Sequence, residues 1–356
     1  MECRIREYGS EYDWLANEGY LLPPGQYQPA FEAAQKFRSG RDALKAVATA
    51  CKSRYKRVLL PALCCESMVS PFTMHGIAPV FYRFSPDYTA DIADVKSKLA
   101  QDTILLYGSY FGIDPFDEAA LLQIQKTHPG VLFLEDRTQD ILQTKEQAFT
   151  PDVTIASIRK WTAIGDGGLL WSGCGCFAAD GQETEFARLR KEAMQIKSAY
   201  LAKGDPEMKK NYREMLGAAS QLLDISAGSF AMTQASEQLL VRLDIAKMYA
   251  RRQENVRVLK AVLMGVANLE LITQTPERST LYFPILVKNQ QEVQAALAQK
   301  GIYCPVLWPV PQEAVGVCPV AEYTAAHMLG IPCDHRYSPE DMKYIARQIV
   351  RVIYEQ

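Results

Sequence analysis

The chain has 356 residues, of which 48% are hydrophobic and 22% are charged, and its formal net charge is -2. This length is enough for one large domain and one smaller domain, each with its own hydrophobic core. The near-neutral charge argues against a nucleic-acid partner, and no segment approaches the roughly 20 apolar residues that a membrane helix needs.

Between residues 40 and 175, short apolar runs alternate with segments of helical character. Continuous apolar runs are typical of strands that are covered on both faces, and therefore of a mostly parallel sheet. Helical segments at 91–100 and 117–126 would supply crossover connections between parallel strands. The predicted strands are 57–60, 79–82, 103–107, 131–134, 153–156 and 169–171.

The second half of the chain has a different character. Residues 181–270 carry long helical patterns, including 233–263. The pattern then predicts a strand at 281–287, a helix at 290–300, a strand at 301–308 and a last helix that Ser338 caps and Pro339 begins. We therefore expect an α/β protein, with a large domain and amino-terminal arm over residues 1–255 and a small α/β domain over 256–356.

Ser39, Gly40 and Arg41 open a segment with helical periodicity. A glycine at the start of a helix lets the backbone approach an anion closely, and the free N–H groups of the first turn favour a phosphate there. An ordinary helix cap has the same composition, so this segment alone does not identify a ligand.

Asp136 and Gln139 follow the apolar run at 131–134. The carboxyl ends of parallel strands are where open α/β sheets bind ligands. Burial raises the pKa of an aspartate, and a cationic partner such as a protonated pyridine nitrogen would restore its charged form. Gln139 could donate a hydrogen bond to a ring hydroxyl oxygen of the same ligand.

Lys160 follows Ser157 by three residues and precedes a glycine-rich turn at 165–168 by five. A deprotonated lysine amine can form a Schiff base with the aldehyde of a cofactor, and it can move protons. Ser157 can offer a hydroxyl to a phosphate group, and the glycines permit a tight return into the next strand. A surface hairpin with an exposed lysine would have the same glycines.

In this order, these segments resemble the DegT/StrS-type sugar aminotransferases, which use pyridoxal 5'-phosphate (PLP) and have fold type I of the PLP enzymes. The most specific shared features are the pair of Asp136 and Gln139 and the spacing from Lys160 to the turn at 165–168. The similarity runs through most of the chain. It also includes residues 25–31, Pro61-Ala62, Met232-Thr233, Arg251-Arg252, 319–322 and 331–332.

The resemblance implies a large domain with a mostly parallel, seven-stranded type of sheet flanked by helices. It implies a Schiff base on Lys160, with Asp136 at the pyridine nitrogen and Gln139 near the ring hydroxyl. Gly40, Arg41 and Ser157 would bind the phosphate. The implied reaction is a ping-pong transfer of an amino group from L-glutamate to a keto sugar linked to a nucleotide, in nucleotide-sugar and polysaccharide biosynthesis. The implied assembly is a homodimer with shared active sites.

The sequence departs from the family pattern at three places. Cys65 stands where members usually have an aromatic residue against the cofactor ring, and we expect Cys65 at that contact. Ser229 stands where an asparagine would reach the phosphate of the partner subunit, and the arginine two residues later is Ala231. The interval from Ser157 to Lys160 is two residues shorter than usual.

Two alternative functions remain open at this point. The first is other PLP chemistry, such as elimination or dehydration, although related dehydratases replace the lysine with histidine and Lys160 is present. The second is a noncatalytic protein that binds PLP or another ligand for regulation. A nicotinamide-dependent enzyme is excluded because no Gly-x-Gly-x-x-Gly segment follows the first strand.

Several further residues have two interpretations. Arg336 could contact a substrate carboxylate or phosphate, and a loop arginine that binds nearby carbonyls is the more ordinary interpretation. Tyr107 and Tyr110 could be pocket walls or core aromatics. The nine cysteines and four histidines lack the spacing of a zinc site, so we expect no metal and free buried thiols in a reducing compartment. The amino terminus has no signal-peptide pattern, so the expected location is the cytoplasm.

Overall fold

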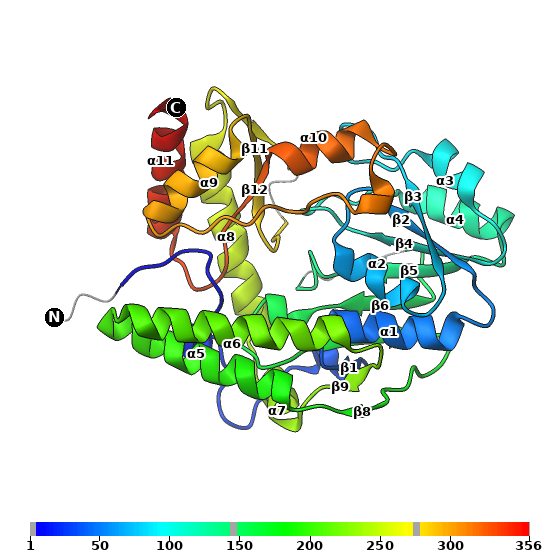
Figure 1. The fold of residues 1–356 in the computed structure, drawn as a ribbon, viewed down its shortest axis with the longest axis horizontal. Coiled ribbons are helices and arrows are strands. Elements are labelled where there is room, and N and C mark those ends of the chain that lie inside the picture. Colours follow the sequence, from blue (N-terminus) through cyan, green and yellow to red (C-terminus); the bar gives the residue numbers. More distant parts are fainter. Residues whose placement is uncertain (1–4, 143–147, 273–277, 356) are drawn as a thin grey trace.

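The computed structural model describes residues 5–142, 148–272 and 278–355. A large sheet with helices on both faces makes up most of the molecule, and a smaller sheet near the carboxyl terminus lies beside it (Figure 1). The order of strands in the large sheet is β3-β2-β4-β5-β6-β7-β1-β9-β8. These strands are β1 (Gln35–Phe37), β2 (Arg57–Pro61), β3 (Ala78–Tyr82), β4 (Thr103–Gly108), β5 (Leu132–Asp136), β6 (Val153–Ala156), β7 (Gly168–Ser172), β8 (Gly181–Gln182) and β9 (Phe230–Ala231).

The first five strands of this order are parallel, as the continuous apolar runs predict. β7 and β1 continue the sheet in antiparallel pairing, which completes a row of seven strands. The two-residue strands β9 and β8 extend this row at one edge. The expected α/β class and mostly parallel sheet are therefore confirmed.

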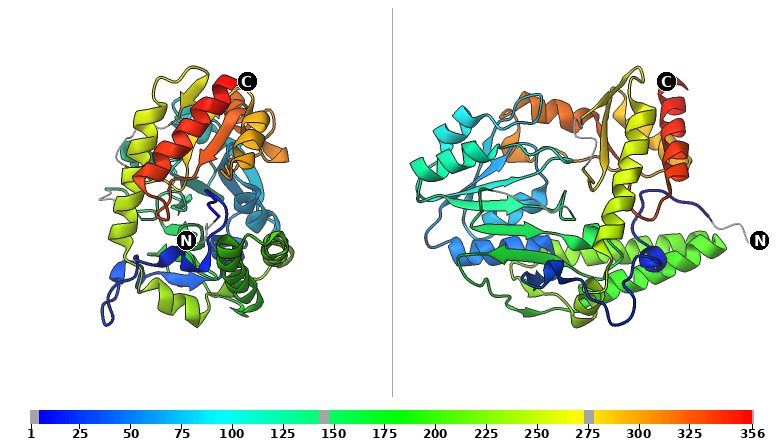
Figure 2. Two further views of the ribbon diagram at one scale, coloured as in Figure 1. Left: turned by 90° about the vertical axis from the view of Figure 1, so that its left-hand side faces the viewer. Right: turned by 180° about the vertical axis from the view of Figure 1, so that it is seen from behind.

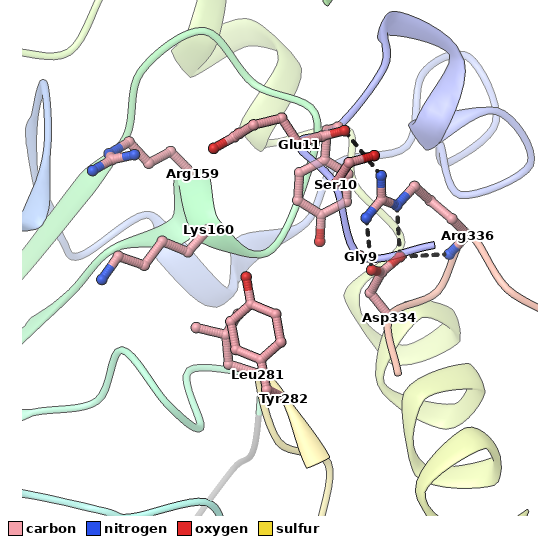
Figure 3. Close-up of a pocket in the computed structure, with 10 residues that line it drawn as sticks. Gly9, Ser10, Glu11, Arg159, Lys160, Leu281, Tyr282, Asp334 and Arg336 are labelled. Atoms are coloured by element: carbon pink, nitrogen blue, oxygen red, sulfur yellow. Dashed lines mark hydrogen bonds and ion pairs between the residues drawn. The ribbon is translucent and has the colours of Figure 1, made fainter. Parts of the chain in front are cut away.

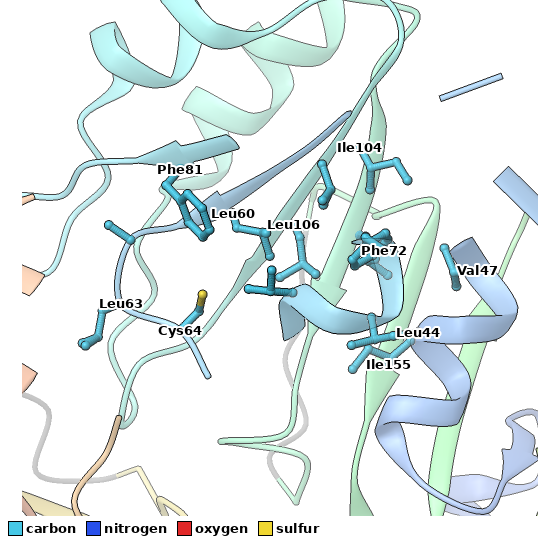
Figure 4. Close-up of a cluster of buried hydrophobic side chains, with 14 of the residues drawn as sticks. Leu44, Val47, Leu60, Leu63, Cys64, Phe72, Phe81, Ile104, Leu106 and Ile155 are labelled. Carbon is cyan, nitrogen blue, oxygen red and sulfur yellow. The ribbon is translucent and has the colours of Figure 1, made fainter. Parts of the chain in front are cut away.

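Successive residues of the central strands enter two different cores. Leu59, Leu105 and Phe133 belong to the core on one face of the sheet, with α3 (Ile92–Lys98) and α4 (Glu118–Thr127). The neighbouring residues Leu60 and Leu106 belong to the core on the other face, with α1 (Gly40–Cys51) and α2 (Glu66–Thr73), as Figure 4 shows. Because side chains alternate along a strand, a strand between two helical layers must be apolar at every position.

Two long helices form an antiparallel pair outside the sheet, α5 (Glu185–Lys203) and α6 (Pro206–Ile225). Gly204 ends α5 with a φ of 78°, a left-handed conformation that glycine adopts without strain. Asp205 then caps α6, and Pro206 is its first residue. The predicted helical stretch at 233–263 is divided into α7 (Gln234–Leu240) and α8 (Ile245–Leu263), and Asp244 caps the second helix.

The carboxy-terminal quarter forms the small three-stranded sheet, which is antiparallel: β10 (Leu269–Leu271), β11 (Phe283–Val287) and β12 (Met328–Ile331). Three helices accompany it: α9 (Gln290–Gln299), α10 (Pro319–His327) and α11 (Pro339–Glu355). The predicted strand at 301–308 is wrong. Its backbone makes only isolated bridges, from Ile302 to Tyr8 and from Val306 to Leu329, because β12 occupies the place beside β11.

The amino-terminal arm packs against this carboxy-terminal part. Tyr8 receives a hydrogen bond from Tyr303 N (2.8 Å) and donates one to Gly301 O (2.9 Å). Tyr8 donates a hydrogen bond to Asp341 of α11 (3.0 Å), and the views in Figure 2 show the described part of the arm near this helix. The described part of the chain also contains the short 3-10 helices η1 (Trp14–Asn17), η2 (Pro29–Phe31), η3 (Ile158–Lys160) and η4 (Gln312–Ala314).

Within the described ranges, no helix has the length and apolarity required to cross a membrane. The eight described cysteines are free, and five of them are buried. Cys174 and Cys176 are exposed, so the expectation of buried thiols is wrong for this pair.

Candidate active site

Lys160 lies at the end of η3 and borders two neighbouring cavities. The strand-end cavity has walls from the carboxyl ends of β4 and β5 and from α2; it is lined by Cys65, Met68, Gly108, Ser109, Tyr110, Asp136, Thr138, Gln139, Lys160 and Trp308. The arm cavity lies between η3, the amino-terminal arm and the carboxy-terminal part; it is lined by Gly9, Ser10, Glu11, Tyr12, Arg159, Lys160, Leu281, Tyr282, Asp334 and Arg336 (Figure 3). Lys160 is therefore a residue that the two cavities share.

Asp136 is the last residue of β5, and its side chain lines the strand-end cavity. The backbone N–H of Thr138 donates to Asp136 Oδ1 (2.8 Å). Burial raises the pKa of Asp136, and the hydrogen bonds from Thr138 and the charge of Lys160 only partly oppose that effect. A cation placed at this carboxylate would restore the charged form, as the sequence predicts for a pyridine nitrogen.

Thr138 joins the end of β5 to the lysine segment. Its hydroxyl oxygen accepts a hydrogen bond from the backbone N–H of Ser157 (3.1 Å). Its carbonyl oxygen accepts one from Trp161 Nε1 (2.6 Å). The sequence pattern does not indicate this role, although Thr138 lies between Asp136 and Gln139. These bonds fix the carboxylate of Asp136 relative to Lys160.

Gln139 lines the strand-end cavity, and only 7% of its surface is exposed. Its Oε1 is buried without a hydrogen-bond partner in the described part of the chain. An unsatisfied buried amide oxygen costs free energy, and a ligand with a polar ring substituent would remove that cost.

The residues expected at a phosphate meet where α1 begins. Ser39 caps α1, with its hydroxyl oxygen accepting from the backbone N–H of Asp42 (3.1 Å), and Gly40 is the first helical residue. A Cβ at Gly40 would come within 3.1 Å of Ser157 Cβ, closer than ordinary van der Waals contact, so glycine favours this close approach. Arg41 forms an ion pair with Asp224. The structure thus brings Gly40 and Ser157 into contact, at a helix end suited to an anion.

Cys65 lies just before α2 and lines the strand-end cavity, and its contact with a cofactor ring remains a prediction. Trp308, which the sequence analysis missed, lines the same cavity from the carboxy-terminal part and stacks on Phe111 (ring centroids 6.0 Å apart). Tyr110 also lines it, whereas Tyr107 is a core residue that packs on Phe116. Aromatic surface is therefore present even though residue 65 is a cysteine.

Ser229 lines neither of these two cavities. Its hydroxyl donates to the carbonyl oxygen of Ala178 (3.2 Å), and its backbone N–H donates to Asp180 Oδ2 (2.7 Å). A contact from Ser229 to a phosphate in a partner subunit remains a prediction.

Arg336 has features of both roles considered from the sequence, a substrate contact and a loop arginine that binds nearby carbonyls. It pairs with both carboxylate oxygens of Asp334 (2.8 Å each) and donates to the carbonyl oxygen of Glu11 (3.2 Å). It also lines the arm cavity, as Figure 3 shows. Arg336 is thus a loop arginine whose position is fixed at the wall of a cavity that Lys160 shares.

These residues fit PLP. Asp136 supplies a buried carboxylate for the pyridine nitrogen, and the unsatisfied Oε1 of Gln139 shows that the cavity wall has a free polar group. Lys160 supplies the amine for the aldehyde, and the contact of Gly40 with Ser157 supplies a helix end for the phosphate.

Comparison with known proteins identifies the family. The profile of the DegT/DnrJ/EryC1/StrS aminotransferase family matches residues 31–350. The PLP form of Spr1654 from Streptococcus pneumoniae, described as a sugar aminotransferase, has a TM-score of 0.64 at 15% identity, with 99% of each chain covered. Helicobacter pylori PseC, an aminotransferase of pseudoaminic acid biosynthesis, has a TM-score of 0.65 at 12% identity, with 99% of this chain and 100% of PseC covered.

A third similar structure is DesI in the presence of its TDP-sugar product, with a TM-score of 0.64 at 15% identity and coverage of 95% of this chain and 87% of DesI. At these identities the structures show a shared fold. No curated protein matches the chain. The family profile spans most of the sequence and confirms the predicted family, enzyme class and cofactor, so the chain belongs to the DegT/DnrJ/EryC1/StrS family of PLP-dependent aminotransferases.

Proposed function

We propose that this protein transfers the amino group of L-glutamate to a keto sugar that is linked to a nucleotide, and that it does so as a homodimer. The observation that carries the proposal is the convergence of Lys160, Asp136 and Gln139 on one cavity in a chain of this family. The sugar substrate is supported by the descriptions of Spr1654 as a sugar aminotransferase and of DesI with a TDP-sugar product.

Bound PLP supplies an aldehyde that takes up the amino group and a ring that withdraws electrons from the reacting carbon. Asp136 would hold the pyridine nitrogen in its protonated form, and that positive charge would offset the rise in the pKa of Asp136 that burial causes. Lys160 would supply the amine that holds the cofactor aldehyde, and its Nζ would move the proton between the substrate carbon and the cofactor carbon. Thr138 bonds both to the carboxylate of Asp136 and to the backbone of Ser157, and it thereby fixes the position of Asp136 relative to the segment that carries Lys160.

The arm cavity offers a place for the substrates. Tyr12, Tyr282 and Arg336 give it aromatic and cationic walls, next to Lys160. A donor amino acid has a carboxylate and a nucleotide-linked sugar has phosphates, and both anions suit an arginine wall. Donor and acceptor would use the same cavity in turn, as a ping-pong reaction requires.

The test is an absorbance titration of the purified protein with PLP, followed by addition of L-glutamate. We expect the band of lysine-bound PLP to form and then to change to the pyridoxamine form in the wild type, with neither change in Lys160→Ala. Return of the PLP band on addition of a nucleotide-linked keto sugar would complete the cycle. A lysine-bound band that no amino donor discharges would contradict the proposal and favour other PLP chemistry or a noncatalytic binder.

A further inference from the structure

Three guanidinium groups surround the ring of Phe186. Arg38, Arg159 and Arg190 have their Cζ atoms 5.7, 5.7 and 5.8 Å from its centroid. The quadrupole of an aromatic ring attracts each cation separately, but it does not remove the repulsion among three positive charges. Each guanidinium therefore needs a negative partner.

Two of the three arginines have carboxylate partners within the chain. Arg38 pairs with Asp42 (2.9 Å) and with Glu183 (2.7 Å). Arg190 lies 3.6 Å from Glu11 and also donates to the carbonyl oxygen of Gly165 (3.1 Å). These two charges are compensated before any ligand binds.

Arg159 differs from Arg38 and Arg190 in its lack of a carboxylate partner among the described residues. Among the described residues, no carboxylate lies within ion-pair distance of it, and its Nε is buried without a hydrogen-bond partner. Burial and the charge of Arg190 lower the pKa of Arg159 to about 10, although Glu11 opposes this shift. A partly buried cation without a partner costs free energy that an anionic ligand would recover.

The direction of the side chain indicates where that anion lies. In Figure 3, Arg159 and Lys160 extend the same way, and both point away from Arg336. Arg41 and Asp42, in the first turn of α1, are among the charges that act on Arg159. Arg38, which pairs with Asp42 in the first turn of α1, shares the ring of Phe186 with Arg159. The guanidinium of Arg159 therefore lies near the start of α1, where Gly40 approaches Ser157.

We propose that Arg159 binds the phosphate group of PLP, together with the first turn of α1 and the hydroxyl of Ser157. The planar guanidinium matches two phosphate oxygens at once, and the N–H groups of the helix end suit the remaining oxygen. This inference depends on the cofactor, and it deepens the proposed function by naming the cation that neutralises the phosphate.

The test compares the affinities of the apoprotein for PLP and for pyridoxal, which lacks the phosphate, without donor or sugar. We expect Arg159→Gln to weaken PLP binding by about 10- to 100-fold, the range of a charge-assisted hydrogen bond, and to leave pyridoxal binding unchanged. Arg159→Lys keeps the charge without the planar fork, so its loss for PLP should be smaller. Arg257→Gln removes one exposed positive charge from α8 and serves as the matched control.

Three outcomes would overturn the inference. The first is an equal loss of PLP and pyridoxal binding in a folded Arg159→Gln protein. The second is unchanged affinity for both, with a raised KM for the amino donor, which would place a donor carboxylate at this guanidinium instead. The third applies if Arg159→Gln does not fold: Arg159→Lys would then prefer PLP over pyridoxal as strongly as the wild type does. Binding of PLP without any transfer from glutamate would contradict the proposed function and leave this inference standing.

Discussion

The acidity of Asp136 depends on its burial at the end of β5. Burial raises the pKa of its carboxyl, so the apoprotein favours the protonated form more than a solvated aspartate would. Because the folded-state pKa lies above the unfolded value, ionisation of Asp136 costs stability as the pH rises through that interval. A pyridinium partner reverses this cost, and cofactor binding and ionisation of Asp136 are therefore linked.

Asp136→Asn should retain PLP but slow the half-reaction with the amino donor by about 100-fold, corresponding to about 3 kcal/mol for the loss of a buried charge pair. Stopped-flow absorbance measures this rate. The control is Glu135→Gln, because residue 135 points to the opposite side of β5 and does not line the strand-end cavity. Equal rates in Asp136→Asn and the wild type would remove Asp136 from the site.

His335 provides a pH dependence of stability. It is 1% exposed, and burial together with Arg252 lowers its pKa to about 3. Because this value lies below that of an unfolded histidine, the stability due to neutral His335 is complete above about pH 6.5 and decreases as the pH falls. Between pH 7 and 5 the loss should be about 2 kcal/mol.

His335→Phe should abolish that part of the loss, and denaturant titrations at pH 7 and pH 5 would measure it. The ring of His335 lies between those of Tyr12 and Tyr20, at 5.9 and 4.8 Å, and phenylalanine can make similar contacts. His128→Phe, at the end of α4, is the control for general effects of losing a histidine. A pH dependence that is identical in His335→Phe and in the wild type would contradict the prediction.

At the scale of elements, the contact between β7 and α1 determines where the phosphate helix begins. Gly168 starts β7, and a side chain there would overlap the carbonyl oxygen of Ser39 and come within 2.6 Å of Gly40 N. These atoms belong to the backbone and cannot rotate away. The glycine-rich turn therefore serves the packing of two elements, in addition to the tight return that the sequence indicates.

Gly168→Ala should lower the free energy of unfolding by about 1–3 kcal/mol, the usual cost of overpacking, and should also weaken PLP binding because the start of α1 is displaced. Urea titrations and PLP titrations would measure the two effects. Gly173→Ala, five residues later, is the matched control because a side chain there meets no atom within 4 Å. Equal stability of the two variants would show that α1 adjusts without cost.

The elements that the sequence predicts correctly are those with a strong apolar period. Strands β2 to β7 all coincide with predicted runs, because a strand between two helical layers is apolar at every position. β1, β8 and β9 were not predicted, since they have two or three residues each and depend on their neighbours in the sheet. The run at 301–308 is as apolar as a strand, but only the tertiary structure shows that β12 takes the place beside β11.

The same reasoning separates the site residues that the sequence could indicate from those that it could not. The sequence indicates Asp136 and Gln139 by the interval between them, and Lys160 by its distance from the turn at 165–168. The structure brings the three residues to one cavity. Trp308 comes from the carboxy-terminal part of the chain, and no local pattern connects it to the end of β5. The free charge of Arg159 is likewise visible only when the partners of Arg38 and Arg190 are known.

For the whole molecule, we propose that residues 1–255 and 256–356 correspond to the large and small domains. The helix α8 (Ile245–Leu263) runs through this boundary, so one continuous helix would connect the two parts. Val256, Leu259 and Leu263 of α8 belong to the carboxy-terminal core, whereas Ile245 and Met248 belong to a core around η3. The two ends of α8 are thus packed in different parts of the protein.

The proposed assembly of the whole molecule is a homodimer. If the active sites are shared between subunits, sedimentation equilibrium should give twice the mass of the chain, at concentrations where the enzyme is active. A mixture of Lys160→Ala and Ser229→Ala subunits would form hybrid dimers, and one site in each would have both native residues. We expect more activity from the mixture than from either variant alone, and a concentration-independent monomer mass would contradict the shared site.

The pairing of Tyr8 with the chain around Ile302 has a consequence for how substrates arrive. The residues that follow, Gly9 to Tyr12, wall the arm cavity, whereas Asp136 and Lys160 belong to the large sheet and its connections. A rotation of the carboxy-terminal part about α8 would carry the amino-terminal arm with it. This motion would open the arm cavity on the side formed by Gly9 to Tyr12. Asp136 and Lys160 would stay in place. Substrates could therefore exchange in every catalytic cycle while these two residues kept the cofactor bound.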